Sequence, residues 1–504
     1  MLCLLLGSQV YPVPAKPVNA ALTLWSPLAP GISYREFFLP GPNRAYVARL
    51  ERSNPQAIIE SGIAQGRLSG GLETVRQIAE RYDQSLGAWG GKWGTRNQVV
   101  VAINGSFYDP ETGIPRGGQV QSGWYAKHFE ELQNGSGFAW TLDRRAFIGG
   151  CVVHRPAKQL ITFLNSGQTM PFDDINLARG KNSLVIYTPQ FDAATPKEEQ
   201  GVEVQVQMSQ PMQLVPLPEM VTGTIRQVFH NQGSTPLPFD SLVLSASGAA
   251  ADRLHALAQI GAQVGVSQEI KHFQPDCKTP NPDSWTRTYA SISGSFTLLR
   301  DGVLQHTDDL GALVHNPRTA IAFNQDYVFF IVVDGRDSLR SRGKSIVELG
   351  IFAKMTLGAT WAIAQDGGGS STMVVNGQVK NHPNADLKDQ PGSSLSNGRL
   401  NAPAMKDTER AVANSLFMAV QLPKEISIRF RAGDRIAIIG SDPVNLRLGP
   451  GTNYAALSTL PPNTEGVVVD GGLLNGVLAK GTYWWKAAFG DLTGWVSEDY
   501  LVSR

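Results

Sequence analysis

Cysteine is scarce in this chain of 504 residues, which has only Cys3, Cys151 and Cys277 and no Cys-x-x-Cys pair. This scarcity argues against a zinc site or a disulfide scaffold. The chain also lacks an excess of either charge, because 44 Lys and Arg stand against 43 Asp and Glu. That balance gives no electrostatic basis for binding nucleic acid or an anionic membrane, so we expect neither as a partner.

Long apolar runs and familiar catalytic fingerprints are missing as well. No stretch approaches the ~20 apolar residues of a membrane span, and we expect none. The absence of GxSxG, HExxH, P-loop and dinucleotide motifs counts against the common hydrolase and nucleotide-binding classes. Present instead are 52 Gly, 31 Pro and 42% hydrophobic residues, which indicate a turn-rich and strand-rich protein with a large core.

The first residues have features of an export signal. An apolar stub, Met1–Gly7, precedes a proline-rich stretch that ends in Val18-Asn19-Ala20, a small-residue pattern of the kind that signal peptidase cuts. We therefore expect residues 1–20 to be a partial signal peptide and the chain to be secreted, periplasmic or attached to the cell envelope; the alternative is a cytosolic tail. After export, Cys151 and Cys277 would either pair or stay as buried thiols.

Hydrophobic periodicity predicts an α+β protein with mixed sheets. The expected units are a catalytic body over residues 30–422 with a β-rich subdomain at about 150–290, a linker at 423–434 and a small all-β barrel at 435–504. Helices are expected near 72–82, 250–260 and 345–357. The apolar run Tyr327–Val333 predicts a central strand that is covered on both faces.

Two predicted strands end in loops that begin with aspartate. Asp334-Gly335-Arg336 follows the central strand, and Asp366 precedes three glycines and three hydroxyl residues. Consecutive glycines expose backbone amides and let a ligand approach the main chain closely. The second loop therefore suits an anionic or polyhydroxylated ligand, although a tight turn between strands is the alternative.

The side chains at these loops are those needed for glycoside chemistry. A β-α-β unit would bring Asp334 and Asp366 to the carboxyl edge of one sheet, and paired carboxylates hydrolyse glycosidic bonds. Each aspartate alone is equally explained as a turn former. Arg318 and Arg336 can bind phosphate in bidentate fashion or form surface ion pairs. Glu348 is explained by a capping box and is set aside.

Six segments of the chain resemble the phosphodiester glycosidase family, over residues 99–420. They are Asn104–Phe107, Asn316–Ala320, Asp334–Arg336, Ser341–Glu348, Asp366–Met373 and Glu409–Asn414. The resemblance implies hydrolysis of a sugar-1-phosphodiester to free sugar and a phosphomonoester. The chain departs from the family in its long β-rich stretch between Asn104 and Asn316 and in an extra loop before Glu409.

Together, the residues and the resemblance give a candidate site with two catalytic residues, Asp334 and Asp366. The candidate substrate-binding residues are Asn104, Arg318, Thr319, Arg336, Gly367, Gly368, Gly369, Ser370, Ser371, Thr372, Glu409 and Arg410. The sequence indicates no cofactor with certainty. A divalent cation at the two aspartates is left open, because no complete oxygen-ligand loop is visible. His315 and His382 are candidate acids or ligands, but lone histidines in loops usually have no such role.

The C-terminal unit resembles a bacterial SH3-like domain in Asn445–Tyr454 and Gly494-Trp495-Val496. The resemblance implies a cell-wall or peptide ligand. The aromatic candidates for it are Tyr454, Trp484, Trp485 and Trp495, unless these side chains pack the core of the unit.

The sequence thus predicts an exported hydrolase, a phosphodiester glycosidase, acting on cell-envelope or extracellular glycans. Two alternatives stay open at this stage. One is a non-catalytic protein that binds glycans or the cell wall. The other is a glycosidase of phosphate-free exopolysaccharide, for which the two arginines would matter far less.

Overall fold

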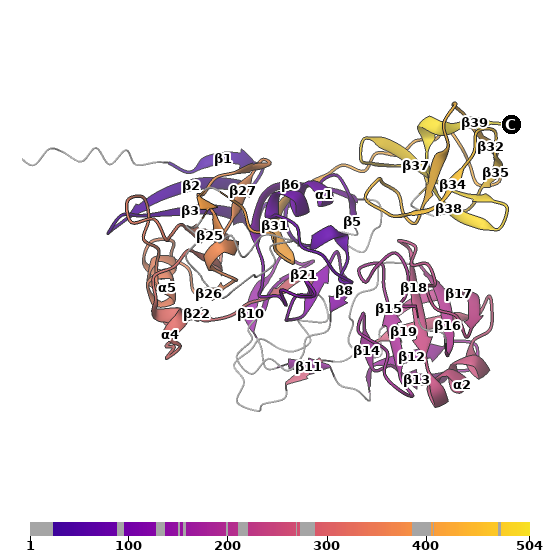
Figure 1. Cartoon of the computed structure of the whole chain (residues 1–504), viewed down its shortest axis with the longest axis horizontal. Helices are drawn as coiled ribbons and strands as arrows, with labels where there is room; N and C mark the ends of the chain where they lie inside the picture. Colours follow the sequence, from indigo (N-terminus) through magenta and orange to yellow (C-terminus); the bar gives the residue numbers. More distant parts are fainter. Residues whose placement is uncertain are drawn as a thin grey trace, which may run out of the picture.

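The computed structural model describes residues 24–87, 95–127, 137–149, 152–154, 158–197, 200–209, 220–268, 270–272, 288–385, 405–406, 408–471 and 475–504. The expected signal segment and all three cysteines lie outside these residues. Strands account for 48% of the structure and helices for 11%. The predicted α+β class is therefore wrong, because the protein is mostly β (Figure 1).

An antiparallel sheet of eight strands carries the candidate site at one edge. Its order is β1-β2-β3-β25-β24-β26-β22-β23, and α4 and α5 cover one of its faces. The elements are β1 (Ser26–Ala29), β2 (Ile32–Leu39), β3 (Asn43–Glu51), β22 (Thr297–Arg300), β23 (Val303–Leu304), β24 (Arg318–Phe323), β25 (Tyr327–Val333), β26 (Trp361–Ala364), α4 (Leu310–Leu313) and α5 (Ile346–Met355).

Two further sheets lie against the other face of this one. The first has the order β28-β27-β6-β31-β4, with β5 beside β6, and the second has the order β10-β9-β21-β7-β8. Helix α1 packs on the outer face of the first. The elements are β4 (Ala57–Ile63), η1 (Ala64–Gly66), α1 (Val75–Tyr82), β5 (Leu86–Gly87), β6 (Thr95–Asn104), β7 (Gln119–Gln121), β8 (Trp124–Lys127), β9 (Gly137–Thr141), β10 (Ala146–Gly149), β21 (Thr288–Ser293), η4 (Gly368–Ser370), β27 (Met373–Val375), β28 (Gln378–Val379) and β31 (Asn414–Leu422).

The β-rich stretch forms a second eight-stranded sheet, β13-β12-β19-β17-β16-β18-β15-β14, with α2 beside it. Two-stranded pairings, β11-β20 and β29-β30, lie outside the large sheets. The elements are β11 (Val152–His154), β12 (Leu160–Phe163), β13 (Gln168–Pro171), β14 (Asp174–Ile175), β15 (Leu184–Tyr187), β16 (Val202–Met208), β17 (Val221–His230), β18 (Ser241–Ala246), α2 (Gly248–Leu257), β19 (Gln263–Ser267), β20 (Ile270–His272), β29 (Asn384–Ala385) and β30 (Met405–Lys406).

The C-terminal residues form a sheet of their own, β34-β33-β38-β37-β35-β32-β39, with β36 paired to β37. A buried ion pair joins this C-terminal unit to the end of the β-rich sheet, with Lys486 Nζ 2.8 Å from Asp240 Oδ2. Lys480 donates hydrogen bonds to the backbone carbonyls of Arg81 and Asp83 at the end of α1. The elements are β32 (Arg435–Ile438), β33 (Val444–Arg447), β34 (Ala456–Leu460), β35 (Glu465–Val468), β36 (Val477–Ala479), β37 (Thr482–Phe489), β38 (Leu492–Ser497), η7 (Glu498–Tyr500) and β39 (Leu501–Ser503).

The error in fold class has a specific cause in the environment of β25. Phe330 and Val332 pack toward the second layer of sheets, whereas Ile331 and Val333 pack toward α5. An antiparallel strand between a helix and a second sheet is buried on both faces, as a strand of a parallel sheet is. The continuous apolar run in the sequence therefore could not distinguish the two architectures.

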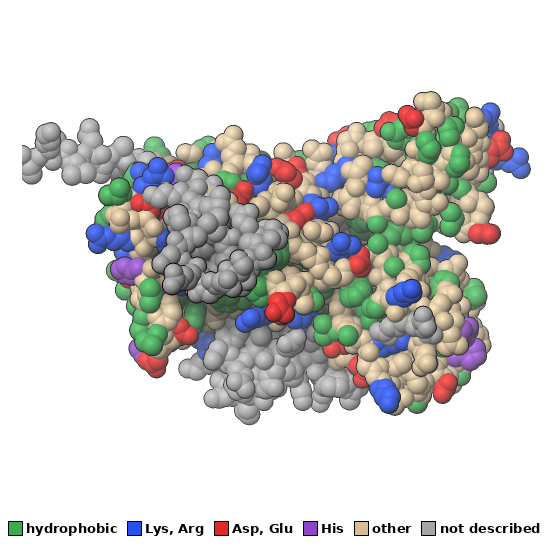
Figure 2. Space-filling model, in the orientation of Figure 1, with side chains coloured by type: hydrophobic (Ala, Val, Ile, Leu, Met, Phe, Trp, Pro, Cys, Tyr) green, Lys and Arg blue, Asp and Glu red, His purple; other side chains and the backbone are tan. Residues whose placement is uncertain are grey.

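The described surface shows no strong charge segregation on the face drawn in Figure 2, where basic and acidic side chains are interspersed. None of the helices among the described residues is long and apolar enough to cross a membrane. In the same view, a hollow separates the C-terminal unit from the β-rich sheet at the right of the molecule.

Candidate functional site

The candidate site lies at the edge of the first sheet where β25 and β26 end. Both strands are antiparallel to β24, which lies between them, so β25 and β26 run in the same direction. Arg318, the first residue of β24, is paired with Val333, and Thr319 accepts a backbone hydrogen bond of 2.9 Å from Gln365. Asp334 and Asp366 thus follow two strands that end at one edge, with the start of β24 between them.

Asp334 is buried and held by the segment that follows β28. Its Oδ1 accepts hydrogen bonds from Asn381 Nδ2 and from the backbone N–H of His382, both at 3.0 Å. Burial raises the pKa of the Asp334 carboxyl, and these hydrogen bonds oppose the rise. A hollow of about 10 Å³ adjoins Asp334, Ser341 and His382, which is close to the space that one water molecule needs.

Asp366 is held by its own glycine-rich loop. Ser370 Oγ donates a hydrogen bond of 2.6 Å to Asp366 Oδ2 and accepts one of 3.2 Å from Arg410 Nη1. The backbone N–H of Asp366 donates to the carbonyl of Gly105 at 3.0 Å. Gly368 has a φ of +62°, in the left-handed region where a side chain is unfavourable. The loop therefore holds the Asp366 carboxylate in a fixed position, and Ser370 links that carboxylate to Arg410.

Arg318 and Arg336 approach the same pair of glycines. A Cβ on Gly368 would lie 2.9 Å from Arg336 Nη2, and one on Gly367 would lie 3.8 Å from Arg318 Nη1. Nε and Nη2 of Arg318 donate hydrogen bonds to carbonyls of Lys344 and Val314, which fix its guanidinium. Burial, and then the positive charge of Arg336, lower the pKa of Arg318. Two cationic groups thus lie close together beside the half-buried backbone of Gly367 and Gly368.

Asn104 was predicted to bind substrate, but its side chain lies inside the protein behind the glycine-rich loop. It is fully buried, its Nδ2 donates to the carbonyl of Asp366 at 2.7 Å, and its Oδ1 accepts from Thr319 Oγ1 at 2.7 Å and from the N–H of Thr372 at 3.2 Å. Asn104 and Thr319 therefore tie the glycine-rich loop to β24 and β6. Their contacts position the loop and are internal to the protein.

The remaining predicted residues fall into two groups. The hydroxyls of Ser371 and Thr372 are buried and find no hydrogen-bond partner among the described residues. Glu409 points to α1 instead, where its carboxylate lies 3.4 Å from Arg76 Nε. Of the neighbouring pair, only Arg410 is shown in contact with the glycine-rich loop.

The comparison with known families concerns this part of the chain. Residues 240–418 match the family model described as phosphodiester glycosidase. The matched segment, residues 240–418, contains Asp334, Asp366, Arg318 and Arg336, whereas Asn104 lies before it. It is shorter than the range 99–420 over which the sequence resembles the family.

Three solved structures align with the chain at low identity. A hypothetical protein from Synechocystis has 16% identity and a TM-score of 0.49, and the alignment covers 77% of this chain and 62% of that one. A Burkholderia pseudomallei protein named for its expected export has 20% identity, a TM-score of 0.46 and coverage of 76% and 74%. The catalytic domain of zebrafish N-acetylglucosamine-1-phosphodiester alpha-N-acetylglucosaminidase, auto-inhibited by its pro-peptide, has 14% identity, a TM-score of 0.33 and coverage of 80% and 85%. No curated protein matches the chain.

Three further residues of the matched segment contact the site: Asn381, which the sequence did not indicate, His382, which was set aside as a lone loop histidine, and Asn414, which was given no role. Asn381 and His382 hold Asp334, and Asn414 accepts a hydrogen bond of 3.0 Å at Oδ1 from the N–H of Ser106, beside Gly105. The polar run Lys380-Asn381-His382-Pro383 directly after a short hairpin was the available signal. This run did not indicate which residue it contacts, because it comes next to Asp334 only when the chain folds.

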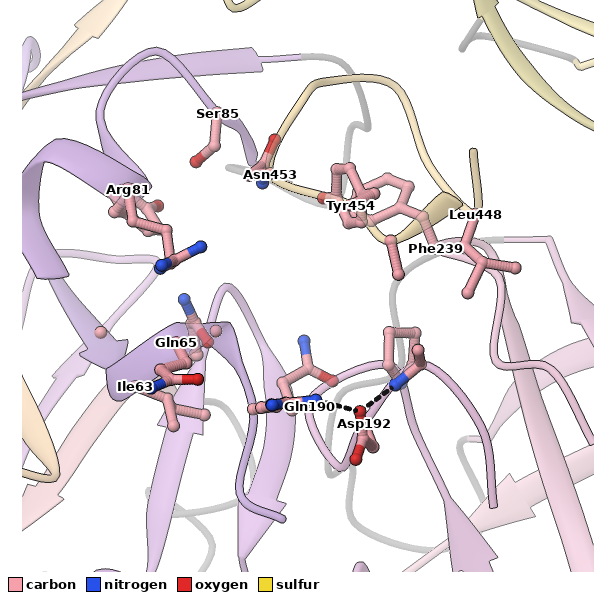
Figure 3. Close-up of a pocket in the computed structure, with 18 of the residues that line it drawn as sticks. Ile63, Gln65, Arg81, Ser85, Gln190, Asp192, Phe239, Leu448, Asn453 and Tyr454 are labelled. Atoms are coloured by element: carbon pink, nitrogen blue, oxygen red, sulfur yellow. Dashed lines mark hydrogen bonds and ion pairs between the residues drawn. The ribbon is translucent and has the colours of Figure 1, made fainter. Parts of the chain in front are cut away.

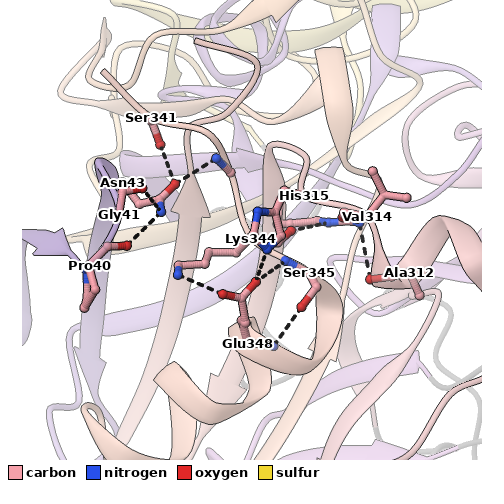
Figure 4. A network of polar contacts seen from close by, with 12 residues as sticks. Pro40, Gly41, Asn43, Ala312, Val314, His315, Ser341, Lys344, Ser345 and Glu348 are labelled. Carbon is pink, nitrogen blue, oxygen red and sulfur yellow. Dashed lines mark hydrogen bonds and ion pairs between the residues drawn. The ribbon is translucent and has the colours of Figure 1, made fainter. Parts of the chain in front are cut away.

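A second polar cluster caps α5 and lies next to the site, because the Lys344 carbonyl in it accepts a hydrogen bond from Arg318 Nε (Figure 4). Ser345 and Glu348 form the predicted capping box at the start of α5. Glu348 also lies 2.9 Å from Lys344 Nζ and 2.8 Å from His315 Nε2. His315 is therefore accounted for by its carboxylate partner.

The aromatic residues of the C-terminal unit are mostly internal. Trp484, Trp485 and Trp495 are buried, and Trp484 and Trp495 belong to the same hydrophobic cluster as the β-rich sheet. Tyr454 differs, because its ring lines a cavity beside Phe239. The SH3-like character of the unit and its cell-wall or peptide ligand stay predictions.

No group of three or more His, Cys, Asp or Glu side chains able to hold a metal ion occurs within the described part of the chain. The cation considered for Asp334 and Asp366 therefore has no ready donor set among these residues. It stays a prediction, and no role in the proposal below depends on it.

Proposed function

We propose that this chain hydrolyses the glycosidic bond of a sugar-1-phosphodiester, releasing free sugar and a phosphomonoester. The match of residues 240–418 to the phosphodiester glycosidase family supports a glycosidase-type activity. The observation that carries the finer proposal is the pair of guanidinium groups, Arg318 and Arg336, at Gly367 and Gly368. A site for a phosphate-free glycan would have no use for two adjacent cations.

The two arginines bind the phosphate of the substrate. Arg318 already donates to backbone carbonyls through Nε and Nη2, and its Nη1 lies near Gly367. Like charges held close together repel one another, and an anion between them removes that penalty. Charge-assisted hydrogen bonds from the guanidinium groups and the loop amides then stabilise the charge that develops on the departing phosphate.

The carboxylates act on the sugar. Water oxygen adds to the anomeric carbon, its proton passes to one of Asp334 and Asp366, and the other stabilises the oxocarbenium-like transition state. The bond between the anomeric carbon and oxygen breaks, and the phosphate keeps that oxygen with the electron pair. A phosphomonoester is a better leaving group than a sugar alkoxide, so the demand on a general acid is small.

The hollow beside Asp334 supports a place for the attacking water. Its volume of about 10 Å³ is near the minimum for one water molecule. Gly367 and Gly368 are half-buried and would let phosphate oxygens or sugar hydroxyls approach the backbone, whereas Ser370 is fully buried and would hold Asp366 in place. Asn104 and Thr319 position the loop from behind.

The experiment is hydrolysis of methyl-phosphate diesters of glucose-1-phosphate and N-acetylglucosamine-1-phosphate in H₂¹⁸O with the full chain. Label in the sugar hydroxyl at the anomeric carbon supports the proposal. Label in the phosphate means that the P–O bond is cut and overturns the mechanism. The isotope is needed because P–O cleavage on the sugar side releases the same two products.

Two variants complete this test. Asp366→Asn should abolish turnover but leave substrate binding, which distinguishes an enzyme from a glycan-binding protein. Arg336→Ala should weaken turnover of the diesters strongly. If a phosphate-free glycan is the better substrate and Arg336→Ala leaves its cleavage unchanged, the phosphodiester proposal is wrong.

We further propose that the enzyme is exported and acts on glycans of the cell envelope or outside the cell. The support is the pattern of residues 1–20, with its apolar stub and small-residue site. N-terminal sequencing of the protein recovered from cell fractions tests it. A mature chain that begins at or near Ala21 is the expected result, and an uncut cytosolic chain would contradict export.

A further inference from the structure

A cavity of about 460 Å³ lies away from the candidate site, at the junction of three parts of the chain (Figure 3). One wall comes from η1 and α1 with Gln65 and Arg81, and another from the loop after β15 with Asp192. The turn after β33 closes it with Tyr454. Its volume falls within the roughly 300–1,000 Å³ of small-molecule sites. None of the residues predicted for the glycosidase site lines it.

The charged groups around this junction cavity leave one positive charge unbalanced. Arg67 Nη1 lies 3.1 Å from Asp192 Oδ1, and Arg81 pairs with Glu73. Arg447, the third arginine of the wall, has no carboxylate partner among the described residues. Three guanidinium groups are therefore matched by two acidic side chains.

A further carboxyl group behind the wall does not face the cavity. Glu60 has no exposed surface, and its oxygens accept hydrogen bonds from the hydroxyls of Tyr82 and Ser122, two residues of the wall. Burial raises the pKa of Glu60, so its surroundings oppose ionisation. The excess of positive charge at the wall therefore stays with Arg447.

The guanidinium of Arg447 uses one nitrogen inside the protein and leaves the other two without partners. Its Nη1 donates a hydrogen bond of 2.8 Å to the carbonyl of Tyr454. Nε and Nη2 have no hydrogen-bond partner in the described part of the chain, and neither atom is completely buried. These two nitrogens form the edge that binds both oxygens of one carboxylate or phosphate group. Burial lowers the pKa of Arg447, because its charge is partly removed from water, and a bound anion would offset that cost.

Aromatic rings form an apolar wall next to Arg447. The rings of Phe239 and Tyr454 lie 5.2 Å apart in an edge-to-face arrangement, and Trp124 also lines the cavity. Figure 3 shows these two rings across the open space from Arg81. A molecule in the cavity therefore meets flat apolar faces beside a cation.

We propose that this cavity is a second ligand site, which binds an organic monoanion with an apolar body and a single carboxylate or phosphodiester group. One unbalanced positive charge matches one negative charge. A neutral ligand would leave the charge of Arg447 unbalanced, and a small inorganic anion would leave the rings of Phe239 and Tyr454 uncovered. The proposal goes beyond the proposed function, because it assigns no reaction and needs none of the residues at the sheet edge.

The test is calorimetric titration of the full chain with 3-phenylpropionate, 2-naphthoate and diphenyl phosphate. Binding of at least one of these anions is expected, and the one that binds identifies the acidic group. The neutral amides of the two carboxylates and acetate should each bind at least tenfold more weakly. Arg447→Gln should weaken binding of the anion about tenfold or more. The matched control is Arg435→Gln on the exposed side of β32, outside the cavity, which should not change it.

A second variant and thermal unfolding separate a ligand role from a structural role. Phe239→Leu keeps an apolar side chain but removes a flat face, and it should weaken binding about threefold or more, whereas Phe38→Leu on the exposed end of β2 should not. Loss of binding at an unchanged melting temperature supports the proposal. Absence of binding by all three anions, equal binding of the amides, or binding unchanged in Arg447→Gln overturns it. Hydrolysis of the phosphodiesters should persist in Arg447→Gln, so failure here is distinct from failure of the proposed function.

Discussion

Asp334 and Asn104 show two different uses of a buried polar side chain. Asn104 has every polar atom bonded inside the protein, whereas Asp334 keeps a carboxylate beside a small hollow. The carboxylate is held by two donors on Oδ1, but burial still raises its pKa. Its environment therefore opposes ionisation, which is typical of a group kept for chemistry.

Asp334→Asn should uncouple stability from activity. Because the pKa of Asp334 is raised above 3.8, the folded chain holds this proton more tightly than the unfolded chain, and ionisation destabilises the fold as pH rises. The asparagine variant should equal or exceed the parent in free energy of unfolding at pH 7, with a smaller difference at pH 4.5. Turnover should fall about 10²–10⁴-fold.

Urea unfolding at the two pH values measures this effect. Asp326→Asn, in the exposed turn before β25 at the opposite end of the strand, is the control and should show no such pH-dependent difference. A variant Asp334→Asn that is less stable than its parent at pH 7 would show that the ionised carboxylate stabilises the fold.

Gly368→Ala tests the approach of Arg336 to the loop. The substitution places a Cβ 2.9 Å from Arg336 Nη2 at a φ of +62°, so it strains the backbone and displaces the arginine. The control is Gly377→Ala, whose φ of +75° carries the same strain but whose Cβ meets nothing within 4 Å. Both should lose about 1–2 kcal/mol of stability.

Only Gly368→Ala should also lose activity, by about tenfold or more, through the misplaced phosphate contact. Assays of diester hydrolysis alongside unfolding curves separate the two effects. Equal activity loss in both variants would mean that backbone strain, and not the arginine, is responsible.

At the scale of single elements, local signals in the sequence predicted more than long-range ones. The helices at 72–82, 250–260 and 345–357 exist as α1, α2 and α5 with shifted ends, and Thr74 and Ser345 cap two of them. The strand over Tyr327–Val333 is also present. These succeed because periodicity and caps act within a few residues.

The partners of each strand were not predictable in the same way. The segment over 319–364 suggested a β-α-β unit, but β24 inserts between β25 and β26 and makes the sheet antiparallel. Strand order depends on contacts between segments far apart in the chain, and the apolar pattern of a single strand does not specify its neighbours. The positions of Asp334 and Asp366 at strand ends were predictable, whereas the hold of Asn381 on Asp334 was not.

Ser345→Ala should destabilise α5. Ser345 Oγ accepts the N–H of Glu348 at 3.2 Å, and loss of an N-cap typically costs about 0.5–2 kcal/mol. Ser247→Ala is the comparison, because it removes an exposed hydrogen bond from Ser247 Oγ to the carbonyl of Gly180 but no cap bond of the ten-residue helix α2. Chemical denaturation should show the larger loss for Ser345→Ala, and equal losses would contradict the capping role.

At the scale of the whole molecule, the C-terminal unit is docked rather than loosely tethered. Lys486 reaches Asp240 of the β-rich sheet, Lys480 reaches the end of α1, and Arg96 Nη2 lies 3.0 Å from Glu425 Oε1. These contacts join residues that are far apart in the chain. No local pattern in the sequence marked the residues that dock this unit.

Lys486→Ala should weaken this docking strongly. It leaves Asp240 buried without its cation, and breaking a buried ion pair costs about 3–5 kcal/mol. The control is Lys354→Ala on the exposed side of α5, which should change little. In unfolding curves, the double variant Lys486→Met/Asp240→Leu should recover the free energy of unfolding that Lys486→Ala loses. If Lys486→Ala loses no more stability than Lys354→Ala, the buried ion pair does not stabilise the docking.

The pairing of β4 with β31 has a consequence for folding during synthesis of the chain. Residues 57–63 are all buried in the finished sheet, yet the strand that covers them, residues 414–422, lies roughly 350 residues later. At ribosomal rates of about 5–20 residues per second, the apolar strand waits about 20–70 s for its neighbour. During that interval its unpaired edge is open to aggregation. We therefore expect co-expression of a chaperone that binds nascent chains to raise the soluble yield of this protein.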